Sequence, residues 1–304
     1  MRRLFLTLVA ALVLGGAAAA AQSYVPHRVF ETARGAFADF EAMAADLAKA
    51  DIILVGEQHD DPNTHRLQLA VLEALARRAR PVIVSLEMFE RDVQEPLEHF
   101  VMGHMEEAEF LKQARPWPRY ATDYKPLVDF AIARGWAVLA ANVPRRIASE
   151  VSKGGLDALG TKPAEERALF ASDLQCPVGD EYFKRFAQAM GGHPAPGTDA
   201  ASVEAQRTTE RYYYSQCVKD ETMAESIARA FTSSRTGDRP PAIVHFNGAF
   251  HSDYGLGTAA RVQRRLPTAR VVILSIKPVK DLDNLNVSAE DKRVANYIVY
   301  TVGK

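Results

Sequence analysis

The chain contains the same pattern twice: a short apolar run followed by a glycine and, three residues later, a histidine. The first run, residues 52–55, leads into Gly56-Glu57-Gln58-His59, and the second, residues 242–246, is followed by Gly248-Ala249-Phe250-His251. Apolar runs without polar alternation predict strands that are buried on both faces of a parallel sheet. In such sheets the ligand crevice lies beyond the carboxyl ends of the strands. We therefore expect both histidines to face one cleft.

Further runs of this kind extend the pattern to a whole sheet. Strands are predicted at residues 82–86, 136–141 and 270–275, with a final edge strand within 294–302. The segments between them have helical spacing, and strand-helix-strand units form right-handed parallel crossovers. The predicted fold class is α/β, with a mostly parallel central sheet flanked by helices.

One long stretch lacks a convincing strand. Residues 154–239 are rich in helix formers, and we predict a helical insertion that covers the carboxyl-end cleft. Residues 51–304 then form a single domain, preceded over 22–50 by an extended arm and a helix. Inside the insertion, one face of a long helix is predicted from residues at spacings of three and four: Tyr213, Cys217, Asp220, Ala224, Ile227 and Phe231.

Asp220 is a carboxylate on that otherwise apolar stripe. A buried carboxylate is costly unless it has a partner. Either the stripe faces the polar cleft or Asp220 caps or pairs locally, and we favour the cleft.

The N-terminal residues predict export. Arg2 and Arg3 precede the apolar run 4–14, and small residues follow at 17–21, which is typical of a secretory signal cleaved near Ala21. The run is shorter than the roughly 20 residues of a spanning helix. No cysteine follows the signal, so we expect a soluble periplasmic protein without a lipid anchor or stable membrane insertion.

The net charge of the chain limits the classes of partner. The formal net charge of −1 gives no basic surface, which argues against nucleic acid as a partner.

The two cysteines, Cys176 and Cys217, could pair in an oxidising compartment or could both be buried thiols.

Four polar residues follow three predicted strands: Glu57, His59, Glu87 and His251. Imidazole and carboxylate ligands together suit a divalent transition metal such as Zn, Mn, Fe or Co. A bound metal could generate a hydroxide nucleophile, with the free glutamate as general base. Without a metal, each carboxylate could orient an imidazole for acid and base steps.

Taken together in their order along the chain, these motifs resemble the ChaN-like haem-binding uptake proteins of the Tiki superfamily, which also includes the Tiki metalloproteases and erythromycin-esterase-like enzymes. The matching segments span about residues 51–257. They are Gly56-Glu57-Gln58-His59, Ser85-Leu86-Glu87-Met88-Phe89, Asp123-Tyr124-Lys125-Pro126-Leu127, Ala141-Asn142-Val143-Pro144-Arg145, the segment from Gln216 through Asp220 to Ala224, and Gly248-Ala249-Phe250-His251.

The resemblance implies a haem-binding protein of the bacterial envelope that serves iron acquisition, with tyrosine ligation of the haem and haem-linked dimerisation. It also implies an envelope transporter or receptor as a partner. Haem requires an axial ligand, apolar walls and cations for its propionates. The residues that we assign to cofactor binding on this basis are Tyr124, Tyr213, Tyr254, Arg145, Asn142 and Asp220. Tyr120, Tyr212, Tyr214, Arg119 and Arg146 are further candidates.

Two functions therefore follow from the sequence. The first is a haem-binding uptake protein in which the Glu/His cleft is inherited or secondary, and whose ligand lies in the carboxyl-end cleft or at a dimer interface. The second is a metal-dependent hydrolase, similar to a protease or an esterase, that uses Glu57, His59, Glu87 and His251. The whole pattern and the signal favour the first function.

Overall fold

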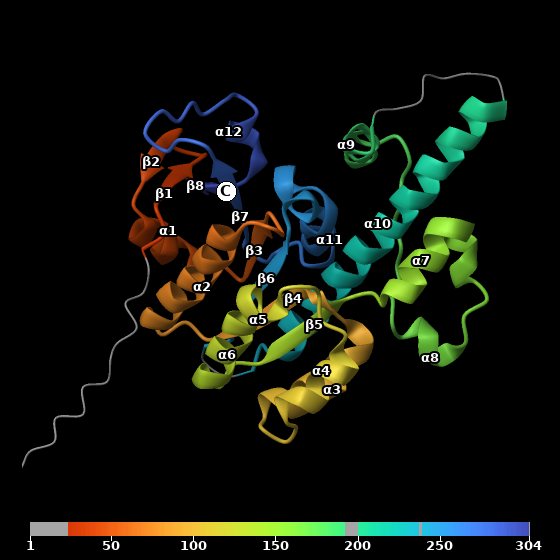
Figure 1. Cartoon of the computed structure of the whole chain (residues 1–304), viewed down its shortest axis with the longest axis horizontal. Helices are drawn as coiled ribbons and strands as arrows, with labels where there is room; N and C mark the ends of the chain where they lie inside the picture. Colours follow the sequence, from red (N-terminus) through yellow and green to blue (C-terminus); the bar gives the residue numbers. More distant parts are fainter. Residues whose placement is uncertain (1–23, 192–199, 237–238, 304) are drawn as a thin grey trace, which may run out of the picture.

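The computed structural model describes residues 24–191, 200–236 and 239–303. Its centre is an eight-stranded sheet in the order β2-β1-β8-β7-β3-β6-β4-β5 (Figure 1). Six of these strands run parallel to one another. They are β3 (Ile52–Glu57), β4 (Val82–Glu90), β5 (Val138–Asn142), β6 (Ala242–Gly248), β7 (Val271–Val279) and β8 (Tyr297–Val302). The predicted α/β class with a mostly parallel sheet is confirmed.

The amino-terminal side of the sheet differs from the prediction. The segment expected to be an extended arm contains β1 (His27–Glu31) and β2 (Ala36–Ala38), which pair with each other as antiparallel strands. β1 also pairs antiparallel with β8. The strand predicted within 294–302 is present as β8, but its expected place at the edge of the sheet is wrong, because β8 lies between β7 and β1. Its partner comes from the opposite end of the chain.

Helices cover both faces of the sheet (Figure 1). Alternate residues of β3 enter two different cores. Val55 packs in the core that contains Leu67, whereas Leu54 packs in the core that contains Ile227. The larger helices are α1 (Phe40–Leu47), α2 (Pro62–Arg77), α3 (Gln94–Val101), α4 (Glu107–Ala114), α6 (Lys125–Arg134), α7 (Arg145–Gly154), α9 (Glu181–Ala189), α10 (Ala200–Ser233) and α11 (Gly257–Arg265).

Short helical segments complete the chain. They are α5 (Tyr120–Asp123), α8 (Ala164–Arg167) and α12 (Asp291–Val294), with 3-10 turns η1 (Arg91–Val93), η2 (Leu156–Leu159), η3 (Ala249–His251) and η4 (Asp253–Gly255). No helix in the described part of the chain is both long enough and apolar enough to cross a membrane.

Helices α7 to α10 lie between β5 and β6, and α10 is the longest of them. The N-terminal part of α10 extends away from the sheet beside α7 and α9 (Figure 1). All six residues of the predicted stripe, from Tyr213 to Phe231, are buried. The stripe passes from an aromatic cluster around Tyr213 to the sheet at Ile227 and Phe231.

The two cysteines form a disulfide bond. Cys176 lies in the segment before α9 and Cys217 lies on α10, and their sulfur atoms are bonded. Of the two alternatives from the sequence, the structure therefore has the paired form. The bond fixes the start of the α9 segment to α10.

Candidate functional site

A cleft of about 460 Å³ lies beyond the carboxyl ends of β3, β4 and β6. Its polar lining includes Glu57, His59, Glu87 and His251, the four residues that the sequence placed at strand ends. α9 and α10 contribute to its walls. The structure thus brings these four residues to one cleft, although they are far apart in the sequence.

His59 and Glu57 form the first carboxylate-imidazole pair. Nδ1 of His59 lies 2.7 Å from Oε1 of Glu57, which is buried, while the His59 side chain is half exposed. Tyr124 donates a hydrogen bond of 2.6 Å to the same Oε1, and Gln68 donates to Oε2. The hydrogen bond with Glu57 raises the pKa of His59 above its ordinary value, against the opposite effect of burial.

His251 belongs to a second cluster and lies between two carboxylates. Its Nδ1 is 2.7 Å from Oδ1 of Asp220, and its Nε2 is 3.2 Å from Oε1 of Glu87. Burial by itself lowers the pKa of His251, but Glu87 and Asp220 outweigh burial and raise it to about 10. Burial alone would raise the pKa values of both carboxyl groups, but His251 and the other hydrogen-bond partners and cations around them together outweigh burial and lower both values. The imidazole is therefore a buried cation at neutral pH.

Asp220 is fully buried and has three side-chain partners. Besides His251, it accepts hydrogen bonds from Tyr182 at 2.6 Å and from Thr258 at 2.8 Å. These contacts explain how a carboxylate is stable on an apolar stripe of α10. His251 lines the cleft, but Asp220 itself does not. The stripe therefore does not face the cleft as expected, and Asp220 is stabilised by pairing behind the lining.

Gly248 separates the two clusters. Its backbone N–H donates a hydrogen bond of 2.7 Å to Oε2 of Glu87. A Cβ atom at this position would lie 2.8 Å from Nε2 of His59, closer than real Cβ contacts. Glycine therefore keeps space open at the point where the two imidazole clusters approach each other.

The geometry gives no support for a metal site. Among the described residues, no three His, Cys, Asp or Glu side chains converge in a way that could hold a metal ion. The physical reason lies in the pairing within the cleft: Glu57 faces His59, and Glu87 faces both His251 and the Gly248 amide.

The residues assigned to cofactor binding lie in different environments. Tyr124 and Tyr213 are buried, and Tyr213 packs against Phe183. Tyr254 lies under the Arg185 guanidinium in a neighbouring hollow. Arg145 is exposed and does not line the cleft, whereas Asn142 donates a hydrogen bond to the backbone carbonyl of Glu87.

The other candidates are also divided between buried and exposed positions. Arg119 binds Asp123, and Arg146 binds Glu166. Tyr120 is buried, whereas 44% of Tyr212 is exposed. Of the three tyrosines at 212–214, Tyr212 therefore has the largest exposed fraction.

Several functional contacts were not predicted from the sequence. Trp117 packs edge-on to His59 with ring centroids 5.1 Å apart, and Lys219 lines the cleft. His65 is buried, and its ring nitrogens lie against Gln68 and Asp123. One signal was present for Lys219, because it adjoins Asp220 on a helix expected to face the cleft.

Comparison with known proteins assigns the chain to a family. The family model for haem-binding uptake proteins of the Tiki superfamily, ChaN, matches residues 43–262. A structure of ChaN of Campylobacter jejuni with cofacial haem binding is similar, with a TM-score of 0.65 and 17% identity over 91% of this chain and 97% of that chain. No curated protein matches the sequence.

Two further solved structures show weaker likeness. A protein from Bacillus cereus has a TM-score of 0.46 and 9% identity, over 84% of this chain and 90% of that chain. An erythromycin esterase, EreC, in its open conformation has a TM-score of 0.45 and 10% identity, over 91% of this chain and 83% of that chain. The family match covers most of the chain, and the chain belongs to the ChaN family of haem-binding uptake proteins in the Tiki superfamily.

Proposed function

We propose that this protein binds haem as cargo and serves haem or iron uptake in the bacterial envelope. The observation that carries the proposal is the family match over residues 43–262, because every residue that lines the cleft falls within that range. The family is described by haem binding and uptake. Within the matched region, the cleft combines space for a ligand with the Glu and His side chains at the strand ends.

The walls of the cleft suit a large apolar ring system. Trp117, Phe186, Met190 and Phe250 all line it. Met190 is 54% exposed, so an apolar surface continues to the rim. Ligand sites are mostly apolar hollows of about 300–1,000 Å³ with a few placed polar groups. The volume and lining of this cleft agree with that description.

We propose Tyr212 as the tyrosine that ligates the haem iron. Tyr124 is buried, and its hydroxyl donates to Glu57, so it is not accessible to iron. Tyr212 is exposed, and it precedes the cleft-lining Gln216 by four residues on α10. Residues four apart lie on the same helix face. Tyr212 therefore lies one turn before Gln216 on the same helix face, next to the cleft lining.

We also propose that the protein acts in the periplasm after cleavage of its signal. The signal segment lies outside the described residues, so this part of the proposal depends on its sequence. The Cys176–Cys217 disulfide supports it, since disulfides persist in oxidising compartments.

Titration of the purified protein with haemin tests the proposal. We expect a saturable Soret band of high-spin ferric haem, and we expect Tyr212→Phe to weaken binding at least about tenfold, because an axial ligand is lost. Tyr24→Phe is the control, since Tyr24 is also exposed but does not line the cleft. Absence of saturable binding by the wild type would refute haem binding, whereas an unchanged Tyr212→Phe spectrum would refute only the ligand assignment.

The two imidazole clusters favour a second function, hydrolysis by acid-base catalysis. Nδ1 of His59 faces Glu57, and no described residue forms a hydrogen bond with its Nε2. A neutral His59 with its proton on Nδ1 could accept a proton at Nε2 from a water molecule, and Glu57 would stabilise the resulting cation.

Hydrolysis of activated esters and of peptides tests this second function. Removal of a general base costs about 10²- to 10⁴-fold in rate, so we expect a loss of this size for His59→Gln. His104→Gln changes an exposed histidine outside the cleft and should leave the rate unaltered. Retained activity with a chelator would favour the metal-free route, and equal rates for wild type and His59→Gln would exclude this function.

A further inference from the structure

Lys219 lines the cleft. Its ammonium group forms no ion pair with any residue in the described part of the chain. It lies on α10, seven residues after Tyr212, and is partly buried. Its own helix offers no acidic partner one turn away, since Ser215, Gln216, Thr222 and Met223 occupy those positions. The ammonium group therefore lacks the i,i+3 and i,i+4 contacts that pair many helix-surface lysines.

The carboxylates near Lys219 along α10 have other partners. Asp220 binds His251, Glu221 binds three arginines of α11, and Glu225 binds Arg91 and Arg229. None of these ion pairs includes Lys219, so these carboxylates do not neutralise its charge.

The carboxylates of the cleft itself are also occupied. Glu57 accepts hydrogen bonds from Tyr124 and Gln68 and faces His59. Glu87 accepts from the Gly248 amide and faces His251. Lys219 is thus a cation that lines a cleft in which the carboxylates have partners of their own.

We infer that Lys219 binds a carboxylate group of the ligand, and that the ligand class is an apolar ring system bearing a carboxylate. The same cleft has Trp117, Phe186, Met190 and Phe250 for the apolar part. A carboxylate beside the ammonium group of Lys219 forms a charge-assisted hydrogen bond, which is stronger than a neutral one. The inference rests on the proposed function, because the propionates of haem are such carboxylates.

The experiment compares the binding of ferric protoporphyrin IX with the binding of its dimethyl ester, both dissolved in the same detergent. The comparison separates recognition of the carboxylate by Lys219 from haem binding itself. Esterification removes the negative charges and leaves the ring and the iron. We expect wild type to bind the free acid about tenfold more tightly than the ester, as one charge-assisted contact allows. Lys219→Met should lose that preference by weaker binding of the free acid alone, and Lys219→Arg should restore it. Lys184→Met, on an exposed position of α9 outside the lining, is the matched control.

The readouts are the Soret titration for affinity and circular dichroism for the folded state. If Lys219→Met is folded and still prefers the free acid as wild type does, Lys219 does not bind the carboxylate, while haem binding stands. If wild type binds both porphyrins equally, carboxylate recognition is refuted for the whole cleft. If wild type binds neither, the proposed function and this inference fail together.

Discussion

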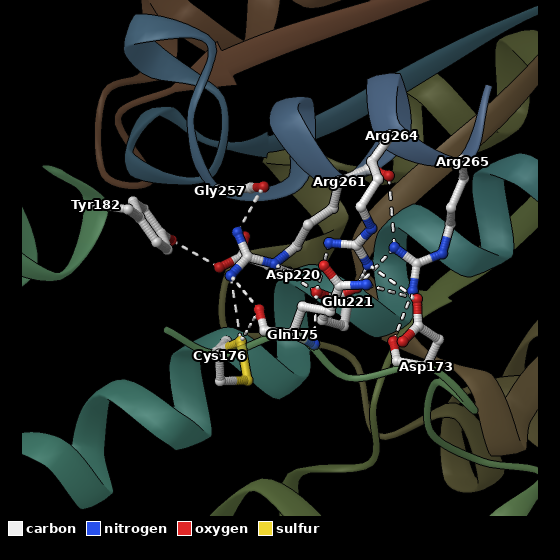
Figure 2. The surroundings of a disulfide bond; sticks show 11 residues. Asp173, Gln175, Cys176, Tyr182, Asp220, Glu221, Gly257, Arg261, Arg264 and Arg265 are labelled. Carbon is white, nitrogen blue, oxygen red and sulfur yellow. Dashed lines mark hydrogen bonds and ion pairs between the residues drawn. A yellow bond between two sulfur atoms is a disulfide. The ribbon is translucent and has the colours of Figure 1, made fainter. Parts of the chain in front are cut away.

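Replacement of Glu221 by alanine should lower the free energy of unfolding by about 3–5 kcal/mol, the usual cost of removing one partner from a buried ion pair. Glu221 is fully buried on α10 and binds three arginines of α11, as Figure 2 shows. Its oxygens lie 3.1 Å from Arg261, 2.7 Å from Arg264 and 2.6 Å from Arg265. Without the carboxylate, three guanidinium groups would repel one another in partly buried positions. Equilibrium unfolding in urea measures the loss.

Asp173→Ala provides the matched control. Asp173 pairs with the same Arg264 at 3.4 Å, but its side chain is 61% exposed. Exposed pairs contribute about 0–1 kcal/mol, so this variant should unfold almost as wild type does. A loss for Glu221→Ala no larger than that for Asp173→Ala would show that the three-arginine cluster does not stabilise the packing of α10 against α11.

The core of the sheet could be predicted because its strands are apolar on both faces. Strands such as β3 and β6 need no polar alternation, so their residue types alone identify them. β1 and β2 could not be predicted in this way. They are short, partly exposed edge strands, and β1 is defined by its pairing with β8 at the other end of the chain.

The candidate site was predictable to the extent that it depends on strand ends. His59 and His251 each follow a buried strand, and parallel strands end at one edge of a sheet. The contacts of Gln68 and Tyr124 with Glu57 were not predictable, because they depend on how α2 and the junction between α5 and α6 lie relative to β3. Propensities describe a local segment, and such contacts are set by the tertiary arrangement.

The pairing of the two cysteines could not be predicted from local sequence either. The sequence gives two cysteines, and their pairing depends on the path of the segment between α8 and α9 relative to α10. That path is also fixed by Arg264 and Arg265, which bind the side chain and the backbone carbonyl of Asp173 (Figure 2). None of these contacts has a local pattern in the sequence.

The dependence of stability on pH should change most when His251 is replaced. Its pKa in the folded protein is about 10, above the ordinary value of 6.5. A raised pKa means that protonated His251 stabilises the fold fully below pH 6.5, and that this contribution is lost as the pH rises through about 10. The pKa values of Glu87 and Asp220 are lowered, so their contributions are present above pH 4.5 and 3.8 and are lost in acid. His251, Glu87 and Asp220 therefore all contribute fully to the stability of the fold between about pH 4.5 and 6.5.

We expect wild type to lose stability on the order of 4 kcal/mol between pH 6.5 and 10 through this group, since each pKa unit corresponds to about 1.4 kcal/mol. His251→Asn should be less stable at pH 6, because Asp220 and Glu87 lose their buried cation, and its profile should be much flatter in the alkaline range. Urea unfolding from pH 5 to 10 measures both effects. His104→Asn, which changes an exposed histidine outside the cleft, should reproduce the wild-type profile. Parallel profiles for wild type and His251→Asn above pH 6.5 would mean that the imidazole is not held as a cation between the two carboxylates.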